Sequence, residues 1–390
     1  MRRENAVPFV CSDCRDVVQD TEGPTEWGCA RCDGSLRPTF DAYEKWDQAV
    51  LDIPGVGRYG RLLPVREPRR LASADAALRP LDSPHLARVL GVASVRLLPQ
   101  TLNETGTFKD NEAVLLAAKC AEWGLDSVCM HSSGNTARAY QHYLEREGTR
   151  VTGFVPEASA YKCVTTELGR SSIVAVPGTM VSAADAAIAH SREHGAVRLA
   201  PSQWKIEGKA PLGLAIAEHC QDTTLIAVTI ASGYGPLGME RGIRRARSAG
   251  LPAPAVHSYR LFQAADAGVL GAAIREGREE IAPGDMIAPE DAFEPTLQST
   301  NPTRTLPLMR SHLAATGSRI DPVTPEEVER NAEVFLERCA ELGVPLDYTL
   351  EKSAFICWAG LVGAAGRGEL RPDERLTVVV SGSAPQEHGS

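Results

Sequence analysis

Four cysteines near the start of the chain are spaced as two pairs. Cys11 and Cys14 form one C-x-x-C motif, and Cys29 and Cys32 form a second. A tight turn can place both thiolates of a pair on one side of the backbone, and two such turns complete a tetrahedral zinc site. We therefore expect a zinc-ribbon-like segment over residues 1–40, with a short hairpin between the pairs. No basic cluster surrounds it, so a structural role is favoured over nucleic-acid binding.

A lysine lies at the end of a second chemical feature, the loop N-E-T-G-T-F-K-D over residues 103–110. This loop leads directly into an apolar helical pattern that begins at Asn111. Lys109 would lie near the positive end of the helix dipole, which disfavours its charged form. A neutral amine can attack an aldehyde to form a Schiff base. The alternative from spacing alone is an ordinary surface lysine.

Two further loops combine small and polar residues at strand-to-helix junctions. Residues 131–136 read H-S-S-G-N-T, and the N–H groups of a helix beginning there can hold a carboxylate. Residues 230–238 read I-A-S-G-Y-G-P-L-G, a glycine-rich turn of the kind that cradles a phosphate. Dinucleotide-type glycine spacing is absent, so a phosphate monoester fits better than NAD. Each loop alone is also consistent with a plain turn or a capped helix start.

Alternating strand and helix patterns must position these loops. Short runs rich in Val, Ile and Thr predict strands over residues 127–130, 151–155, 172–176, 224–230 and 376–380. Helical patterns cover residues 111–123, 136–147, 182–194, 211–220 and 325–342, the last with Thr324 as its N-cap. Strands that alternate with helices indicate parallel sheet and an α/β fold class. Residues 281–323, richer in Pro, Thr and Ser, are expected to form long loops.

The composition and net charge of the chain exclude some classes of binding partner. The chain has 390 residues and a formal net charge of -9, so nucleic acid and anionic membrane are not expected as partners. There is no apolar run long enough to span a membrane and no apolar signal core after the first residues, so we expect a cytoplasmic location. The remaining cysteines are expected to be buried apolar residues: Cys120, Cys129, Cys163, Cys220, Cys339 and Cys357.

Taken together and in this order, the ribbon and the three loops resemble the fold-type II pyridoxal-phosphate enzymes. Within that class the chain is most similar to the threonine synthase family, and within the family to its cysteate synthases. Supporting segments are D-I-P-G at 52–55, L-P-V at 63–65, S-G-N-T-A-R-A-Y at 133–140, V-P-E at 155–157 and V-S-G-S at 380–383.

The resemblance implies a fold like that of the tryptophan synthase β subunit, with two open-sheet α/β domains after the ribbon. Residues 41–102 and 206–390 would form the large domain that binds pyridoxal 5'-phosphate (PLP). Residues 103–205 would form a small mobile domain that closes over the substrate.

The resemblance also assigns roles to the loop residues. Lys109 would be the catalytic Schiff-base lysine, Asn135 would bind the ring hydroxyl of the cofactor, and Ser381 would face its ring nitrogen. A neutral hydroxyl there leaves the ring less electron-withdrawing. The backbone of Ser232, Gly233, Tyr234 and Gly235 would cradle the cofactor phosphate, and the substrate carboxylate would be held by Ser132, Ser133, Asn135 and Thr136.

The implied reaction is β-replacement on O-phospho-L-serine by sulfite, which yields L-cysteate and phosphate. Both anions require local positive charge, for which Arg138 is the first candidate, Arg304 the second and Lys162 the third. Three alternatives remain open: threonine synthase acting on O-phospho-L-homoserine and water, β-replacement by another nucleophile, and a non-catalytic regulatory protein. Glu104, Asn111 and Glu112 depart from the usual threonine synthase lysine motif. A homodimer is the usual state in this group.

Overall fold

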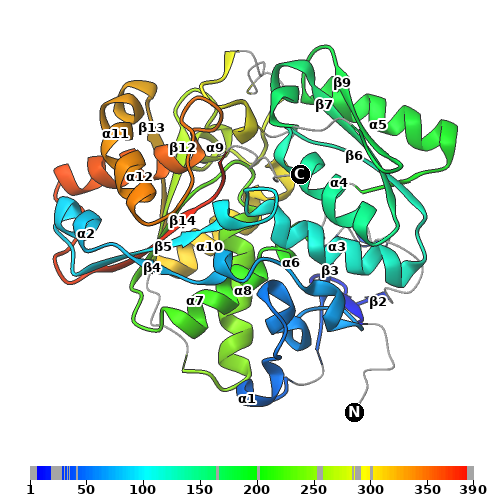
Figure 1. Cartoon of the computed structure of the whole chain (residues 1–390), viewed down its shortest axis with the longest axis horizontal. Helices are drawn as coiled ribbons and strands as arrows, with labels where there is room; N and C mark the ends of the chain where they lie inside the picture. Colours follow the sequence, from blue (N-terminus) through cyan, green and yellow to red (C-terminus); the bar gives the residue numbers. More distant parts are fainter. Residues whose placement is uncertain are drawn as a thin grey trace.

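The computed structural model describes residues 7–18, 29, 31–32, 34, 36–40, 43–163, 167–199, 203–252, 258–282, 285, 291–298 and 302–383. Within them three β-sheets organise the chain, two of which are flanked by helices (Figure 1). The hairpin expected between the cysteine pairs falls largely on residues 19–28, outside the described residues.

The larger sheet has six strands in the order β13-β12-β11-β14-β5-β4. All neighbours are parallel except β4, which runs antiparallel to β5. The strands span β4 Leu81–Asp82, β5 Ser94–Pro99, β11 Leu225–Thr229, β12 Ser258–Ala264, β13 Arg319–Val323 and β14 Arg375–Val380. The sheet therefore joins two parts of the chain that are separated by more than a hundred residues in the sequence.

Helices bury both faces of the larger sheet. One face packs on α2 (Pro84–Leu90), α11 (Pro325–Glu341) and α12 (Ser353–Gly366), in an apolar cluster with strands β5, β11, β12 and β14. On the other side lie α7 (Ala210–His219), α8 (Tyr234–Ser248), α9 (Val269–Arg275) and α10 (Leu306–Thr316). Both faces being covered explains why β11 is an uninterrupted run of buried residues.

The second sheet has five strands in the order β10-β6-β7-β9-β8. They span β6 Ser127–His131, β7 Arg150–Pro156, β8 Glu167–Leu168, β9 Ser171–Val176 and β10 Val197–Arg198. Helices α3 (Lys109–Trp123) and α4 (Asn135–Arg146) lie on one side, and α5 (Met180–His194) packs on the other. These elements lie to the right of the larger sheet in Figure 1.

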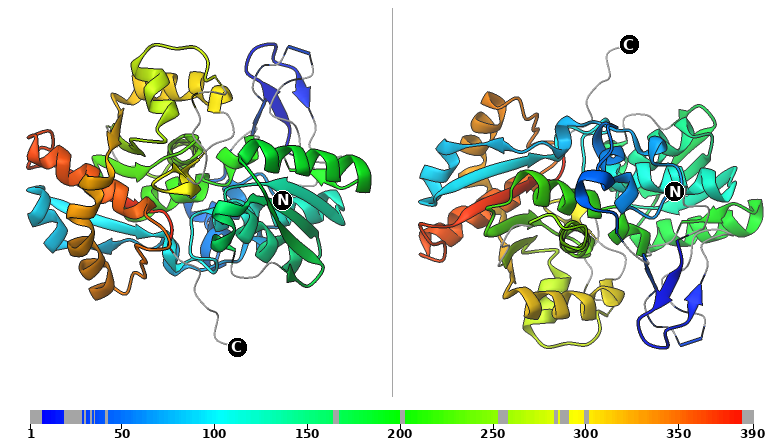
Figure 2. Two further views of the ribbon diagram at one scale, coloured as in Figure 1. Left: turned by 90° about the horizontal axis from the view of Figure 1, so that it is seen from above. Right: turned by 90° about the horizontal axis from the view of Figure 1, so that it is seen from below.

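The N-terminal strands β1 (Phe9–Cys11), β2 (Val17–Val18) and β3 (Leu36–Pro38) form a small antiparallel sheet that projects from the body (Figure 2). Its contact with the body includes Phe9, whose ring lies 5.2 Å from that of Trp204 on α6 (Gln203–Glu207). A short helix α1 (Trp46–Ala49) and 3-10 turns lead onward, over Gly55–Leu62, Pro68–Leu71, Ala76–Leu78 and Gln100–Leu102.

The α/β class is confirmed, and every strand and helix named from the sequence is present with ends shifted by at most two residues. Thr324 begins α11 with reciprocal hydrogen bonds to Glu327, as the N-cap prediction requires. All six scattered cysteines are buried. In the described residues, we find no helix with the length and apolar character needed to cross a bilayer.

The expectation of long loops over residues 281–323 is wrong. Helix α10 and strand β13 occupy the second half of that stretch. Leu306, Met309 and Leu313 recur on one helical face and are buried, while Pro307 lies in the first turn, where its missing N–H costs no hydrogen bond. Pro322 is tolerated because β13 is an edge strand of the larger sheet.

Candidate active site

One pocket lies where the two larger sheets face each other, at the carboxyl ends of parallel strands β6, β11 and β14. This is where open α/β sheets bind their ligands. Apart from Arg138 and Arg304, the predicted cofactor- and substrate-binding residues line it together: Lys109, Ser132, Ser133, Asn135, Thr136, Ser232, Gly233, Tyr234, Gly235 and Ser381.

The loop that carries Lys109 is hydrogen-bonded to the loop that follows β14. Phe108 N donates to Ser381 O at 2.9 Å, and Ser383 N donates to Gly106 O at 3.0 Å. These paired bonds fix Lys109 beside Ser381 although 272 positions separate the two residues in the sequence. Lys109 is the first residue of α3, so the helix begins two residues before the start predicted at Asn111.

Burial lowers the pKa of the Lys109 amine to about 7, since a charged amine loses its hydration there. The positive charge of Lys209 contributes next, and that of Lys205 acts in the same direction, while Glu112 partly opposes them. Lys109 is therefore suited to act as a neutral nucleophile near neutral pH. The dominant cause is burial rather than the helix dipole considered from the sequence.

Lys205 and Lys209 line the same pocket and were missed by the sequence reasoning. Both pair with the buried carboxylate of Glu112, at 3.2 Å from Lys205 Nζ and 2.9 Å from Lys209 Nζ. The Tyr140 hydroxyl also donates to Glu112. Two lysines thus pair with one buried carboxylate beside Lys109, so this wall of the pocket, the lysine wall, keeps a surplus of positive charge for an anionic ligand.

The serine–asparagine loop is held at the start of α4. Ser132 Oγ accepts hydrogen bonds from the N–H groups of Gly134 and Ala137, both at 3.0 Å. Gly134 has φ +113°, and a Cβ there would lie 2.8 Å from Lys162 Cβ, so this position requires glycine. Ser133 Oγ donates across to Thr296 O at 3.0 Å.

The glycine-rich turn after β11 begins helix α8. Gly233 has φ +82°, the left-handed conformation that favours glycine, and Tyr234 is the first helical residue. The N–H groups at a helix start can bind a phosphate, although Pro236 contributes none.

Neither Arg138 nor Arg304 lines the pocket. Arg138 is buried and donates to the carbonyl oxygens of Thr105 and Lys162, so it ties two loops together. The contacts of Arg138 and Arg304 with substrate anions therefore remain predictions, and the lysines that line the pocket are Lys109, Lys205 and Lys209.

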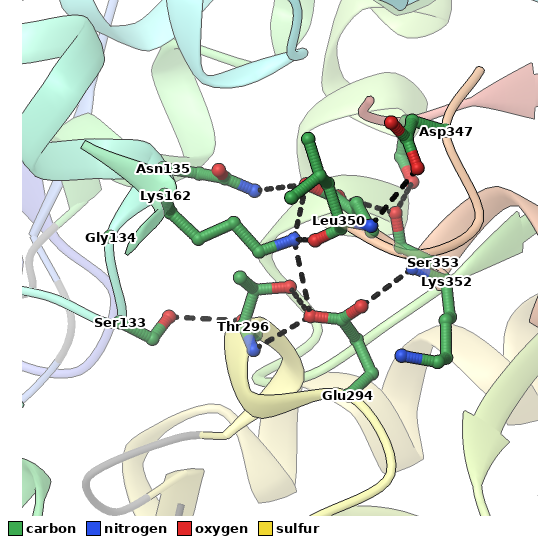
Figure 3. Close-up of polar contacts among 12 residues, drawn as sticks. Ser133, Gly134, Asn135, Lys162, Glu294, Thr296, Asp347, Leu350, Lys352 and Ser353 are labelled. Atoms are coloured by element: carbon green, nitrogen blue, oxygen red, sulfur yellow. Dashed lines mark hydrogen bonds and ion pairs between the residues drawn. The ribbon is translucent and has the colours of Figure 1, made fainter. Parts of the chain in front are cut away.

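Lys162, the third candidate, is fully buried in a different cluster (Figure 3). Its Nζ donates to Leu350 O and lies 3.4 Å from Glu351 Oε2 and 3.6 Å from Glu294 Oε1. Lys162 follows β7 of the five-stranded sheet. Glu294 lies between β12 and β13 of the six-stranded sheet, and Glu351 lies between β13 and β14. This cluster thus connects the part of the chain that forms the five-stranded sheet to the part that forms the six-stranded sheet.

The four N-terminal cysteines converge away from the pocket. Cys11 and Cys32 Sγ lie 3.5 Å apart, Cys14 and Cys29 Sγ lie 3.6 Å apart, and all four sulfurs lie within 4.8 Å of one another. The cluster has the ligand number and donor type of a structural zinc site.

Comparison with known proteins identifies the class. A family model for "Pyridoxal-phosphate dependent enzyme" matches residues 77–382. The threonine synthase of Methanosarcina acetivorans is 24% identical over 363 residues, covering 91% of this chain and 86% of that protein. The cysteate synthase of Methanospirillum hungatei is 24% identical over 403 residues, covering 96% and 89%.

Solved structures agree on the fold. Maize serine racemase superposes with a TM-score of 0.60 at 20% identity, covering 80% of this chain and 90% of that one. Threonine deaminase isoform 2 from Solanum lycopersicum superposes with a TM-score of 0.61 at 16% identity, covering 82% and 88%. The chain belongs to the pyridoxal-phosphate dependent enzyme family and has the fold-type II architecture.

The pocket fits the cofactor of this family. It offers an amine whose pKa is about 7, a glycine-rich turn at a helix start, and a buried amide with an unused acceptor, because Asn135 Oδ1 has no hydrogen-bond partner in the described part of the chain. An orphaned polar atom in a pocket wall indicates that a ligand completes the site.

Proposed function

We propose that this chain catalyses β-replacement on a phosphorylated amino acid, converting O-phospho-L-serine and sulfite into L-cysteate and phosphate. The observation that carries the proposal is the lysine wall. It places a nucleophilic amine with a lowered pKa beside two further lysines in one pocket, which the serine–asparagine loop also lines. Such a site can form a Schiff base and stabilise first a departing anion and then an incoming one.

Named residues would hold PLP. Lys109 would carry it, Asn135 and Ser381 would meet its ring, and the residues from Ser232 to Gly235 would cradle its phosphate. When bound, the cofactor supplies an electron-withdrawing ring that acidifies the α-proton of an attached amino acid. The Lys109 amine, once released, would take that α-proton and later return it to the product.

The substrate would be oriented by the start of α4. The N–H groups of Asn135 and Thr136 at that helix start, with the Thr136 hydroxyl, would bind an α-carboxylate. The Ser133 hydroxyl, which donates to Thr296 O here, would have to turn to join them. Lys205 and Lys209 would stabilise the departing phosphate and then the incoming sulfite. Because Glu112 pairs with both lysines, their side chains are positioned before the anion arrives.

We propose residues 103–205 as a mobile domain that closes over the substrate and excludes water. The contacts of Ser133 with Thr296, Asn135 with Glu351 and Lys162 with Glu294 support a closed arrangement. The cysteine cluster would bind one zinc ion as a structural staple. A homodimer and a cytoplasmic location remain part of the proposal.

Threonine synthesis from O-phospho-L-homoserine and water is the second candidate. The 24% identity with the M. acetivorans threonine synthase over 91% of this chain supports it. The same lysines would then stabilise a phosphate that leaves from the γ-carbon.

The test is phosphate release by the purified holoenzyme from each phospho-amino acid, with and without sulfite, with mass spectrometry of the product. Sulfite-dependent release from phosphoserine that yields cysteate would support the proposal. Release from phosphohomoserine alone would select threonine synthesis. Failure to release phosphate from either substrate would reject both.

A further inference from the structure

The carboxylate of Glu351 connects two side chains that are expected to meet opposite ends of the cofactor ring. Its Oε2 accepts from Asn135 Nδ2 at 2.8 Å, and its Oε1 accepts from Ser353 Oγ at 2.6 Å. Ser353 Oγ in turn accepts from Ser381 Oγ at 3.2 Å. Glu351 is 3% exposed and lines the pocket, as do Asn135, Ser353 and Ser381.

Lys162 holds Glu351 in this position. Its ammonium lies 3.4 Å from Glu351 Oε2 and also donates to the carbonyl of Leu350, the preceding residue (Figure 3). A methyl group on Gly382 would lie 2.3 Å from Glu351 Oε1, so the glycine after Ser381 leaves the space that the carboxylate occupies. The carboxylate is thus confined by an ion pair on one side and by close packing on the other.

The chemistry of the donors fixes the direction of the hydrogen bonds. An ionised carboxylate can only accept, and a serine hydroxyl has one proton to donate. Ser353 therefore gives its proton to Glu351 and can only accept from Ser381. Ser381 gives its own proton to Ser353, which leaves its lone pairs available and no proton for a ligand. At the other oxygen, the Asn135 amide must turn its NH₂ toward Glu351.

We propose that Glu351 is a positioning residue that sets the hydrogen-bond direction at both ends of the cofactor ring, through Ser353 and Ser381 at one end and through Asn135 at the other. This rests on the proposed function, because it takes the pocket to bind PLP. Since Ser381 can only accept, it favours a ring nitrogen that carries a proton. The ring would then withdraw electrons more strongly than a serine hydroxyl alone would allow.

Glu351→Gln tests the direction of the bonds. Asn135 and Lys162 both present N–H donors on one side, so the amide oxygen of the glutamine would turn toward them and its NH₂ toward Ser353. The Ser353 and Ser381 bonds would then reverse, and Ser381 would donate to an unprotonated ring nitrogen. Ser353→Ala breaks the connection without altering the buried charges and serves if the first variant fails to fold.

Glu294→Gln is the matched control. Glu294 is also a buried carboxylate close to Lys162, but its oxygens accept from Thr296 and from Lys352 N, and it has no bond to Ser353 or Asn135. The Glu294→Gln variant removes a carboxylate charge at a distance from Lys162 similar to that of Glu351. A comparison of the two variants therefore separates the effect of the connected hydroxyls from a general effect of charge.

The measurement is nitrogen NMR of holoenzyme reconstituted with PLP that carries an isotope label at the ring nitrogen. We expect a protonated ring nitrogen in the wild type and in Glu294→Gln, and an unprotonated one in Glu351→Gln and Ser353→Ala. The kcat for phosphate release should fall about tenfold to a hundredfold in the latter two, with KM little changed.

An unprotonated nitrogen in the wild type would overturn the inference, as would equal chemical shifts in Glu351→Gln and the wild type. Equal shifts in Glu294→Gln and Glu351→Gln would also overturn it, because charge alone would then be the cause. Failure of the proposed function is a distinct result: no labelled cofactor would be retained, or retention would not depend on Lys109.

Discussion

Two buried clusters of opposite composition border the pocket, which Lys109, Lys205 and Lys209 line from one cluster and Glu351 from the other. On one wall Lys205 and Lys209 both pair with the carboxylate of Glu112, and Lys109 lines the pocket with them. On the other wall a single lysine, Lys162, meets the carboxylates of Glu294 and Glu351. The first wall has surplus positive charge and suits anions, whereas the second has surplus negative charge and orders hydrogen-bond donors.

The difference shows how a chain with a net charge of -9 can bind anionic substrates. The positive charge is concentrated at one place, deep in the pocket, where a low dielectric strengthens its attraction. The carboxylates of the opposite wall are tied to Lys162, to backbone N–H groups and to hydroxyls, so they need not repel a ligand that stays near the lysine wall.

The largest effect is expected for Lys109→Ala. The variant lacks the amine proposed to carry the cofactor and to move the α-proton, so phosphate release should fall by at least about a thousandfold. The visible absorbance of bound PLP should disappear as well. Absorbance spectra and a phosphate assay at equal protein concentration measure both. Retained activity with retained absorbance would remove Lys109 from its role.

Glu112→Gln should leave the charges of Lys205 and Lys209 without their buried carboxylate. Removing one partner of a buried ion pair leaves charge uncompensated, so the free energy of unfolding should fall by about 3–5 kcal/mol, as measured by chemical denaturation. Glu147→Gln is the control, because the Glu147 pair with Arg70 is partly exposed and should cost about 1 kcal/mol or less. Equal losses in the two variants would contradict the distinction.

The pH dependence of cofactor uptake should report the Lys109 amine. Only the neutral amine reacts, and its pKa is lowered to about 7, so the rate of PLP binding to the apoenzyme should rise as the pH increases through about 7 and level off above it. Stopped-flow absorbance measures this rate. A rise centred near 10 would show that the amine is not perturbed.

Lys209→Met tests the cause of the lowered Lys109 pKa in the same measurement of PLP binding against pH. It removes the positive charge that lowers the pKa of Lys109 most, so the midpoint should move to higher pH. The move should be partial, because burial is the largest cause of the lowered pKa and remains in the variant. An unchanged or lower midpoint would contradict the charge coupling between the two lysines.

The smallest effect on chemistry is expected at the cysteine cluster. Its sulfurs do not line the pocket, and its sheet projects from the body. Removing zinc with a chelator should lower the melting temperature while PLP absorbance persists. Metal analysis should find one zinc ion per chain before treatment. Loss of bound PLP on chelation would show that the ribbon supports the pocket directly.

The sequence predicted those parts of the site whose chemistry is contiguous. The lysine loop, the H-S-S-G-N-T loop, the glycine-rich turn and Ser381 each show their chemistry within a few residues, and the structure brings them to one pocket. The cysteine cluster was predicted in the same way, because the spacing of the two C-x-x-C motifs is visible within a short stretch of sequence. The strands and helices named in the sequence analysis followed from local composition and hydrophobic patterns, whereas α10 and β13 were missed.

The clusters that balance charge could not be predicted in this way. Glu112 meets Lys205 and Lys209 from almost a hundred residues away, and Lys162 meets Glu351 from nearly two hundred. Nothing in their immediate sequence shows which side chains they pair with. Arg138 was a reasonable candidate for an anion because of its place on the first turn of α4, but its guanidinium is used by backbone carbonyls. Such pairings depend on tertiary structure alone.

The most direct test of the central claim asks which of the three lysines on the anion-binding wall carries the cofactor. The PLP-loaded protein is reduced with borohydride, which makes a Schiff base permanent, then digested and analysed by mass spectrometry. We predict the added mass on the peptide that contains Lys109 and not on those that contain Lys205 or Lys209. Label on either of the other lysines, or no stable label, would contradict the account.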